Sequence, residues 1–228
     1  MTRKRLVHYA SIAAAALFAA AAPPAGARER AGSLPPPGSY ALSHIQRVPK
    51  ATVLEGSEIS QPLSRYTEGA VTLLGFFYAY CADPNGCPLA WEAFEKVRET
   101  IIARPALHGR VRLVFMSLDP VRDTPGTLSV LARHYEERRD IVPWHFLTTY
   151  SNHFLAPLLR EMGEEISIDR AAAASGGVVL NHLLKVFLID KEGWVREIYS
   201  NQSLDPAAIL GDIETLLLEV AALSRQVK

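Results

Sequence analysis

The apolar positions of the chain form short continuous runs, and these runs predict the strands of a buried sheet. VTLLGFFY at 71–78 has the length and the aromatic and β-branched content of a fully buried strand, and RLVFMSL at 112–118 and WHFL at 144–147 are runs of the same kind. Two further runs, KVFLID and WVREIY, stand on either side of Lys191-Glu192-Gly193, and this spacing predicts a β-hairpin.

Apolar residues at helical spacing fill the segments between these strands. A helix is predicted between Pro88 and Pro105, a second after the N-cap residue Thr124, a third over 155–162 and the last from Pro206. The resulting order, β-α-β-α-β-α-β-β-α, predicts an α/β protein with a central mixed β-sheet flanked by helices. A cysteine at the end of the first strand and another at the start of the next helix make this a thioredoxin-like layout.

The first 27 residues have the features of a secretory signal peptide. Basic residues at 3–5 precede an alanine-rich apolar run over 6–22, which is followed by Ala-Gly-Ala at 25–27. We expect cleavage after Ala27; an uncleaved anchor is the alternative, although the run is near the lower length limit for a spanning helix. The protein is therefore expected to be exported, to the periplasm or the outer face of the inner membrane. Membrane contact is expected only through an uncleaved signal region or through a partner.

Composition divides the rest of the chain into a leader and a domain. Residues 28–50 are rich in Pro, Gly and Ser and lack apolar periodicity, which predicts a flexible leader or tether before a thioredoxin-like domain over 51–228. Removal of residues 1–27 takes away three of the 24 basic residues and none of the 24 acidic ones, so the mature chain is mildly acidic. Phosphate binding requires clustered positive charge, and no nucleic-acid partner is expected.

The segment CADPNGCP at 81–88 contains both cysteines of the chain, Cys81 and Cys87. Asp-Pro-Asn-Gly at 83–86 has the residue preferences of a type I turn, which would bring the two sulfur atoms close together. Cys87 is placed at the N-terminus of a helix, where backbone N–H groups lower the pKa of a thiol. The pair is a static disulfide clamp, a redox couple or part of a metal site. The clamp is disfavoured, because it would close only a short loop.

Four segments resemble the signature segments of the Sco/SenC family of copper proteins: GFFYAYCADPNGCP, SLDPVRDTP at 117–125, WHFLT at 144–148 and NHLLKVFLIDKEG at 181–193. Members of that family have a thioredoxin-like fold and bind one copper ion through two cysteines and a distant histidine. The resemblance implies that Cys81, Cys87 and His182 are copper ligands. This chain departs from the family in having five residues between the cysteines, where family members usually have fewer. The departure concerns the geometry of the ligands, not their chemistry.

Copper suits this ligand set, because thiolates favour Cu(I) and an imidazole favours Cu(II). Family members assist assembly of the binuclear copper site of respiratory cytochrome oxidase. The resemblance therefore implies that the chain binds Cu(I) and Cu(II) and that its partner is the copper-site subunit of a cytochrome oxidase. It also implies an upstream copper donor and a thioredoxin-like reductant as partners. The sequence AAAASGG, within 164–181, predicts a mobile loop before His182 that would let this ligand swing away for transfer.

Other polar residues lie near the expected site. Asp119 at the end of a predicted strand either orients a ligand or forms the turn before the following proline. Asp123 and Thr124 are interpreted as helix caps. Tyr78 and Tyr80 stand on either side of Ala79 just before the cysteine loop and are interpreted as walls of the site, not as ligands.

Three functions from different classes are open. The first is a copper metallochaperone, and the second is a thiol–disulfide oxidoreductase in which Cys81 and Cys87 form a catalytic redox pair that reduces the cysteines of an apo-copper site. The third is a non-catalytic domain with a clamped loop. General thioredoxin-type reductants place a proline just before the strand that here begins at His182, and no proline occurs from 158 to 205. This favours the chaperone over the reductase, and the reductase over the clamp.

Overall fold

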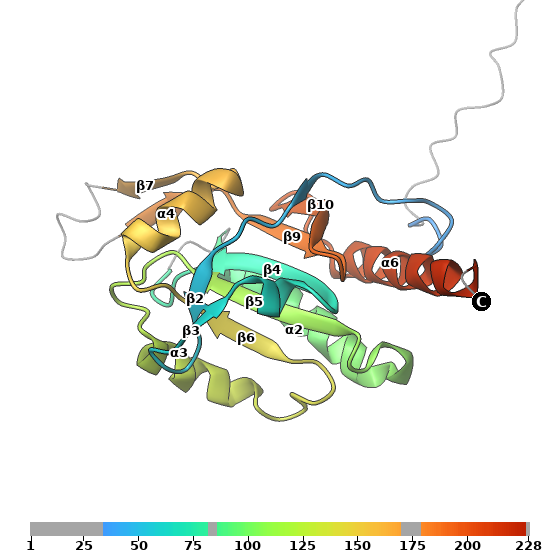
Figure 1. Ribbon diagram of the computed structural model, residues 1–228, viewed down its shortest axis with the longest axis horizontal. Coiled ribbons are helices and arrows are strands. Elements are labelled where there is room, and N and C mark those ends of the chain that lie inside the picture. Colours follow the sequence, from blue (N-terminus) through green and yellow to red (C-terminus); the bar gives the residue numbers. More distant parts are fainter. Residues whose placement is uncertain (1–33, 82–85, 170–178, 227–228) are drawn as a thin grey trace, which may run out of the picture. The chain divides into compact units, whose positions relative to one another are not determined.

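A six-stranded mixed sheet is the centre of the fold in the part of the chain that the structure describes (Figure 1). The structure is a computed structural model and describes residues 34–81, 86–169 and 179–226. In their order across the sheet, the strands are β1 (Gln46–Arg47), β10 (Trp194–Ser200), β9 (Lys185–Ile189), β4 (Val71–Phe77), β5 (Val111–Ser117) and β6 (Trp144–Leu147). β4, β5 and β6 are parallel, whereas β9 and β10 form the predicted antiparallel hairpin. β9 pairs antiparallel with β4, so the predicted central mixed sheet is confirmed.

Helices lie between and after these strands, and all except α1, which the sequence did not predict, begin or end close to the predicted positions. They are α1 (Ser64–Thr67), α2 (Cys87–Ala103), α3 (Pro125–Ala132), α4 (Asn152–Glu161) and α6 (Pro206–Gln226), with 3-10 turns at Pro105–Leu107 and Arg133–Tyr135. The Thr124 Oγ1 accepts a hydrogen bond from the Thr127 N–H (3.2 Å), which confirms Thr124 as the N-cap of α3. Pro157 lies inside α4, and α2 ends just before Pro105.

Aromatic side chains from β4, β5 and α2 form part of the hydrophobic core. Phe115 stacks on Phe77 with ring centres 5.1 Å apart, and the ring of Phe94 lies 4.5 Å from that of Phe115. All three side chains are buried, and each stabilises the fold by about 1.5–3 kcal/mol on leaving water. Gly75 suits this packing, because a Cβ there would lie 3.1 Å from Phe115 and 3.2 Å from Phe94 and both rings would have to shift. The core therefore fixes β4, whose C-terminal end leads to Cys81.

Residues 34–50 are held against the rest of the domain, whereas the sequence predicted a flexible leader. β1 pairs antiparallel with β10, and the Tyr40 hydroxyl donates a hydrogen bond to Asp212 on α6 (2.6 Å). Such contacts use backbone and polar groups, which leave no apolar periodicity for a sequence pattern to reveal. The domain thus begins before residue 51. The predicted signal peptide over 1–27 lies outside the described residues.

The described chain also contains small antiparallel hairpins that the sequence did not predict, β2 (Thr52–Leu54) with β3 (Ser60–Pro62) and β7 (Ile166–Asp169) with β8 (Val179–His182). β8 carries His182 as its last residue. The central part of the predicted mobile loop, 170–178, lies outside the described residues. In the ranges that the structure describes, no helix has the length and apolar character needed to cross a bilayer.

Candidate metal centre

Cys87 and His182, which are 95 residues apart in the chain, lie next to each other in the fold. Cys87 is the first residue of α2 and is 5% exposed, whereas His182 ends β8 and is partly buried. The Cys87 Sγ lies 4.0 Å from the His182 Nε2. Two of the three residues predicted as copper ligands therefore meet in the folded chain.

Cys81 lies beside Cys87 and interacts with it through its side chain. Cys81 follows β4 in a turn, in which its N–H donates to the carbonyl oxygen of Tyr78 (3.1 Å). A hydrogen bond between the two cysteine side chains, together with burial, raises the pKa of Cys87. The sequence predicted a lowered pKa, and that prediction is wrong because these two effects outweigh the backbone N–H groups, which act in the opposite direction. A coordinating metal ion would reverse this balance, since a thiol bound to a metal loses its proton.

Both cysteines are thiols, and most of the turn predicted between them lies outside the described residues. Among the residues that are described, no group of three or more His, Cys, Asp or Glu side chains is arranged to hold a metal ion as it stands. The chemistry of the donor set fits copper, because two thiols and an imidazole supply ligands for both Cu(I) and Cu(II). The full ligand set of Cys81, Cys87 and His182 stays a prediction.

Tyr78 connects the cysteine segment with β8. Its hydroxyl accepts a hydrogen bond from the Leu180 N–H (3.4 Å) and donates to the carbonyl oxygen of the same residue (3.5 Å). Burial, followed by a hydrogen bond to Cys81, raises the pKa of Tyr78 to about 12, so the hydroxyl keeps its proton at neutral pH. Tyr80 is 67% exposed. Of the two tyrosines predicted as walls of the site, Tyr78 is buried there and Tyr80 faces solvent.

The acidic residues that follow β5 have different environments. Asp119 accepts a hydrogen bond from the Arg122 N–H (3.4 Å) and forms an ion pair with the Arg122 side chain (3.7 Å), contacts that are typical of a turn. A role of Asp119 in orienting a metal ligand stays a prediction. Asp123 is fully buried and its carboxylate bonds to residues outside α3, so the prediction that it caps this helix is wrong. A helix has one N-cap residue, and since Thr124 occupies that position, the adjacent Asp123 is available for another role.

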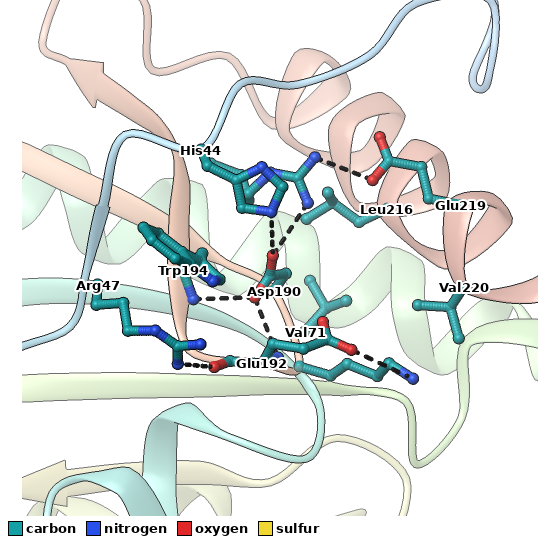
Figure 2. Close-up of a pocket in the computed structure, with 11 residues that line it drawn as sticks. His44, Arg47, Val71, Asp190, Glu192, Trp194, Leu216, Glu219 and Val220 are labelled. Atoms are coloured by element: carbon teal, nitrogen blue, oxygen red, sulfur yellow. Dashed lines mark hydrogen bonds and ion pairs between the residues drawn. The ribbon is translucent and has the colours of Figure 1, made fainter. Parts of the chain in front are cut away.

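A cavity of about 300 Å³ lies at the other end of the sheet, and charged and apolar residues line it (Figure 2). Asp190 lies in its wall, directly after β9, whose last residue Ile189 pairs with Thr72 at the start of β4. Cys81 follows the end of β4, so the cavity and the cysteines lie at opposite ends of that strand. His44 points toward Asp190, with 3.8 Å between Nε2 and Oδ2 (Figure 2).

Arg196 forms part of the wall of this cavity and holds residues 34–50 against the rest of the domain. Its side chain is 6% exposed and donates to Asp190 (3.0 Å) and to Glu219 (2.9 Å). It also donates to the carbonyl oxygens of Leu42 and Ser43. Because these acceptors satisfy the buried guanidinium, we interpret the cavity as a structural junction between residues 34–50, β10 and α6.

Comparisons with known proteins identify relatives of this chain. A family model described as SCO1/SenC matches residues 56–218. Apo Sco1 from Thermus thermophilus is 21% identical with a TM-score of 0.59, and the match covers 78% of this chain and 99% of that chain. ScoI from Bradyrhizobium japonicum, with copper bound, is 18% identical with a TM-score of 0.56, and the match covers 73% and 98% of the two chains.

A further similar structure is that of BsSco, described as a member of the Sco family of cytochrome c oxidase assembly proteins in which a disulfide switch was identified. It is 19% identical with a TM-score of 0.53, and the match covers 75% of this chain and 92% of that chain. At these identities the solved structures establish the fold, and the predicted thioredoxin-like α/β fold is confirmed. Comparison with curated protein sequences gave no significant match.

Proposed function

The chain belongs to the SCO1/SenC family, and from this premise we propose that it binds one copper ion and assists assembly of a cytochrome oxidase. Cys81, Cys87 and His182 would hold the ion, which is cargo for the copper-site subunit of the oxidase. Two structural neighbours support the proposal: Bradyrhizobium japonicum ScoI was solved with copper bound, and BsSco is described as a member of a family of cytochrome c oxidase assembly proteins.

The observation that carries the proposal is the separation of 4.0 Å between the Cys87 Sγ and the His182 Nε2. Zinc bonds of about 2.0–2.3 Å to nitrogen and sulfur together span up to about 4.3 Å, so by this measure the two side chains would be close enough to hold one metal ion. A structural disulfide requires only the two cysteines, so it gives no reason for a histidine next to Cys87. The two thiolates suit Cu(I), and the imidazole adds the harder ligand that Cu(II) prefers.

The contact between the two thiols favours a second function, that of a thiol–disulfide oxidoreductase. In this reaction Cys81 and Cys87 pass two electrons and two protons to a disulfide of the partner, whose cysteines become thiols while a Cys81–Cys87 disulfide forms. The metallochaperone ranks first because His182 contacts Cys87, which dithiol exchange does not require.

Location and further partners follow from the same proposal. The signal-peptide features at 1–27 support export to the periplasm or to the outer face of the inner membrane. Disulfides persist in such an oxidising compartment, and thiols that must bind copper there need a thioredoxin-like reductant as partner. The copper itself must come from an upstream donor.

Copper titration of the reduced and the oxidised protein tests the proposal. We expect the reduced chain to bind one equivalent of copper and the disulfide form to bind none, because a sulfur atom in a disulfide cannot act as a thiolate ligand. A variant with Cys81→Ser and Cys87→Ser is the control and should resemble the oxidised protein. Equal copper binding after oxidation, with no thiol detected, would refute the proposed ligand set.

A further inference from the structure

The Asp123 carboxylate joins the ends of two neighbouring strands of the sheet. Its side chain is fully buried, and Oδ2 accepts hydrogen bonds from the Ser117 Oγ (2.6 Å) and from the Ala79 N–H (3.1 Å). Ser117 is the last residue of β5, whereas Ala79 lies between β4 and Cys81. One buried carboxylate thus connects β5 with the segment that carries a predicted ligand.

A short hydrogen-bonded turn continues this connection to Cys81. The Cys81 N–H donates to the carbonyl oxygen of Tyr78, the residue before Ala79. Asp123 therefore holds the backbone at Ala79, and a hydrogen bond from Cys81 to Tyr78 closes the turn around it. Metal ligands must be held within about 0.5 Å of their working positions, so a restraint this close to Cys81 bears on the geometry of the site.

Burial opposes ionisation of this acid, and α3 does not require its side chain. Burial raises the pKa of Asp123, while the hydrogen bonds from Ser117 and Ala79 act in the opposite direction. Its second oxygen, Oδ1, is also buried and has no hydrogen-bond partner among the described residues. Thr124 caps the helix. What the Asp123 side chain contributes is therefore its hold on the Ala79 backbone at the end of β4.

We propose that Asp123 is a positioning residue, which fixes Cys81 relative to Cys87 and His182. This inference rests on the proposed copper function, because it is the metal that requires the three side chains to converge. Asp123 acts through Ala79 and needs no contact with the ion. What it supplies is a fixed acceptor oxygen, so an amide in its place should serve almost as well.

Two substitutions distinguish the role of the acceptor oxygen from that of the negative charge of Asp123. Asp123→Ala removes the acceptor, whereas in Asp123→Asn the amide oxygen can accept both bonds that Oδ2 accepts. We expect Asp123→Ala to weaken binding of both copper states by about tenfold or more and to shift the thiolate-to-Cu(II) absorption band. Asp123→Asn should retain nearly the wild-type affinity and absorption. Thr124→Ala is the matched control: loss of the cap should lower the unfolding midpoint and leave copper binding unchanged.

A folded Asp123→Ala protein with wild-type copper affinity and absorption would overturn the proposal, and so would an Asn variant as weak as the Ala variant. If Asp123→Ala does not fold, Ser117→Ala takes its place, because it releases one of the two bonds to the carboxylate. A smaller loss of affinity in the same direction is then expected, and unchanged copper binding would overturn the proposal.

Failure of the proposed function would be recognised separately, as a wild-type protein that binds no copper. The thiol–disulfide equilibrium of Cys81 and Cys87 with glutathione then serves as the measurement. Positioning predicts that Asp123→Ala shifts this equilibrium and that Asp123→Asn leaves it near the wild-type value. Equal equilibria in all three proteins would overturn the inference without reference to copper.

Discussion

The Tyr78 hydroxyl bonds to both polar backbone atoms of Leu180, at 3.4 Å from the nitrogen and 3.5 Å from the oxygen. Leu180 lies two residues before His182 in β8, and Tyr78 lies three residues before Cys81. Side chains two positions apart in a strand share a face of the sheet. A single hydroxyl therefore links the strand that carries the predicted imidazole ligand to the segment that carries a predicted thiol ligand.

Tyr78→Phe should loosen this link while the ring stays in the core. We expect a loss of about 1 kcal/mol in the free energy of unfolding, because one set of hydrogen bonds is removed. Cu(II) binding should weaken more than Cu(I) binding, since the imidazole of His182 is positioned through β8. Tyr80→Phe, at a side chain that is 67% exposed, is the control and should change neither quantity. Identical Cu(II) spectra and affinities in Tyr78→Phe and the wild type would show that β8 is held in other ways.

His182→Ala separates metal chemistry from thiol chemistry. The variant should lose far more affinity for Cu(II) than for Cu(I), because two thiolates alone can hold Cu(I). It should still form the Cys81–Cys87 disulfide, which needs only the cysteine loop. The exposed His153 on α4 provides the control substitution, His153→Ala. If His182→Ala bound both copper states as the wild type does, His182 would be a packing residue, and the oxidoreductase would become the leading function.

Much of the sheet could be predicted because its buried strands are continuous apolar runs. The β4 run and the β9–β10 hairpin are fully encoded in this local pattern. The attachment of residues 34–50 could not be predicted in this way, because it depends on backbone pairing in β1 and on the bond from Tyr40 to Asp212. Tyr40 and Asp212 are 172 residues apart in the chain, and no local sequence pattern marks either residue as a partner of the other.

Prediction of the candidate site succeeded to a different extent for each residue. The proximity of Cys87 and His182 was implied by the resemblance of their segments to those of the SCO1/SenC family. The pKa of Cys87 was predicted in the wrong direction, because the helix N-terminus is a local signal whereas burial and the Cys81 thiol belong to the folded structure. Asp123 was misassigned for the same reason, since its partner Ala79 is 44 residues away.

Loss of the Arg196 side chain should lower the free energy of unfolding and leave copper binding unchanged. Arg196→Ala leaves the Asp190 carboxylate, whose side chain is 5% exposed, without its guanidinium partner, and a loss of about 3–5 kcal/mol in unfolding free energy is expected. Arg47→Ala, which removes an exposed guanidinium that lies over Trp194, should cost about 1 kcal/mol or less. Denaturant unfolding measures both values. The copper stoichiometry of the folded variants should stay at the wild-type value, because this junction lies at the opposite end of β4 from Cys81. A small loss in Arg196→Ala, comparable to that of Arg47→Ala, would contradict the role of Arg196 as an anchor.

The buried carboxyl group of Glu164 is expected to lower the stability of the folded chain as the pH rises from mildly acidic to neutral. The residue is 5% exposed, and neither of its carboxylate oxygens has a hydrogen-bond partner among the described residues. Burial raises its pKa from 4.5 to about 7, although the charge of Lys185 acts in the opposite direction. The unfolded carboxyl group loses its proton near its ordinary pKa, whereas the folded one keeps it until about pH 7. Folding is therefore progressively penalised as the pH rises through this window, and the penalty is complete above it.

Glu164→Gln should remove this penalty, because the amide has no charge to bury. At neutral pH the variant should be more stable than the wild type by up to about 3 kcal/mol, and below about pH 4.5 the two should have similar stability. The Lys185 ammonium group stays satisfied in the variant, since it donates to the carbonyl oxygen of Gly163. Glu165→Gln, at the exposed neighbouring position, is the matched control and should follow the wild-type pH profile. Parallel stability curves for the wild type and Glu164→Gln from pH 5 to 8 would mean that Glu164 ionises with its ordinary pKa, and that the folded chain opens a path to solvent around it.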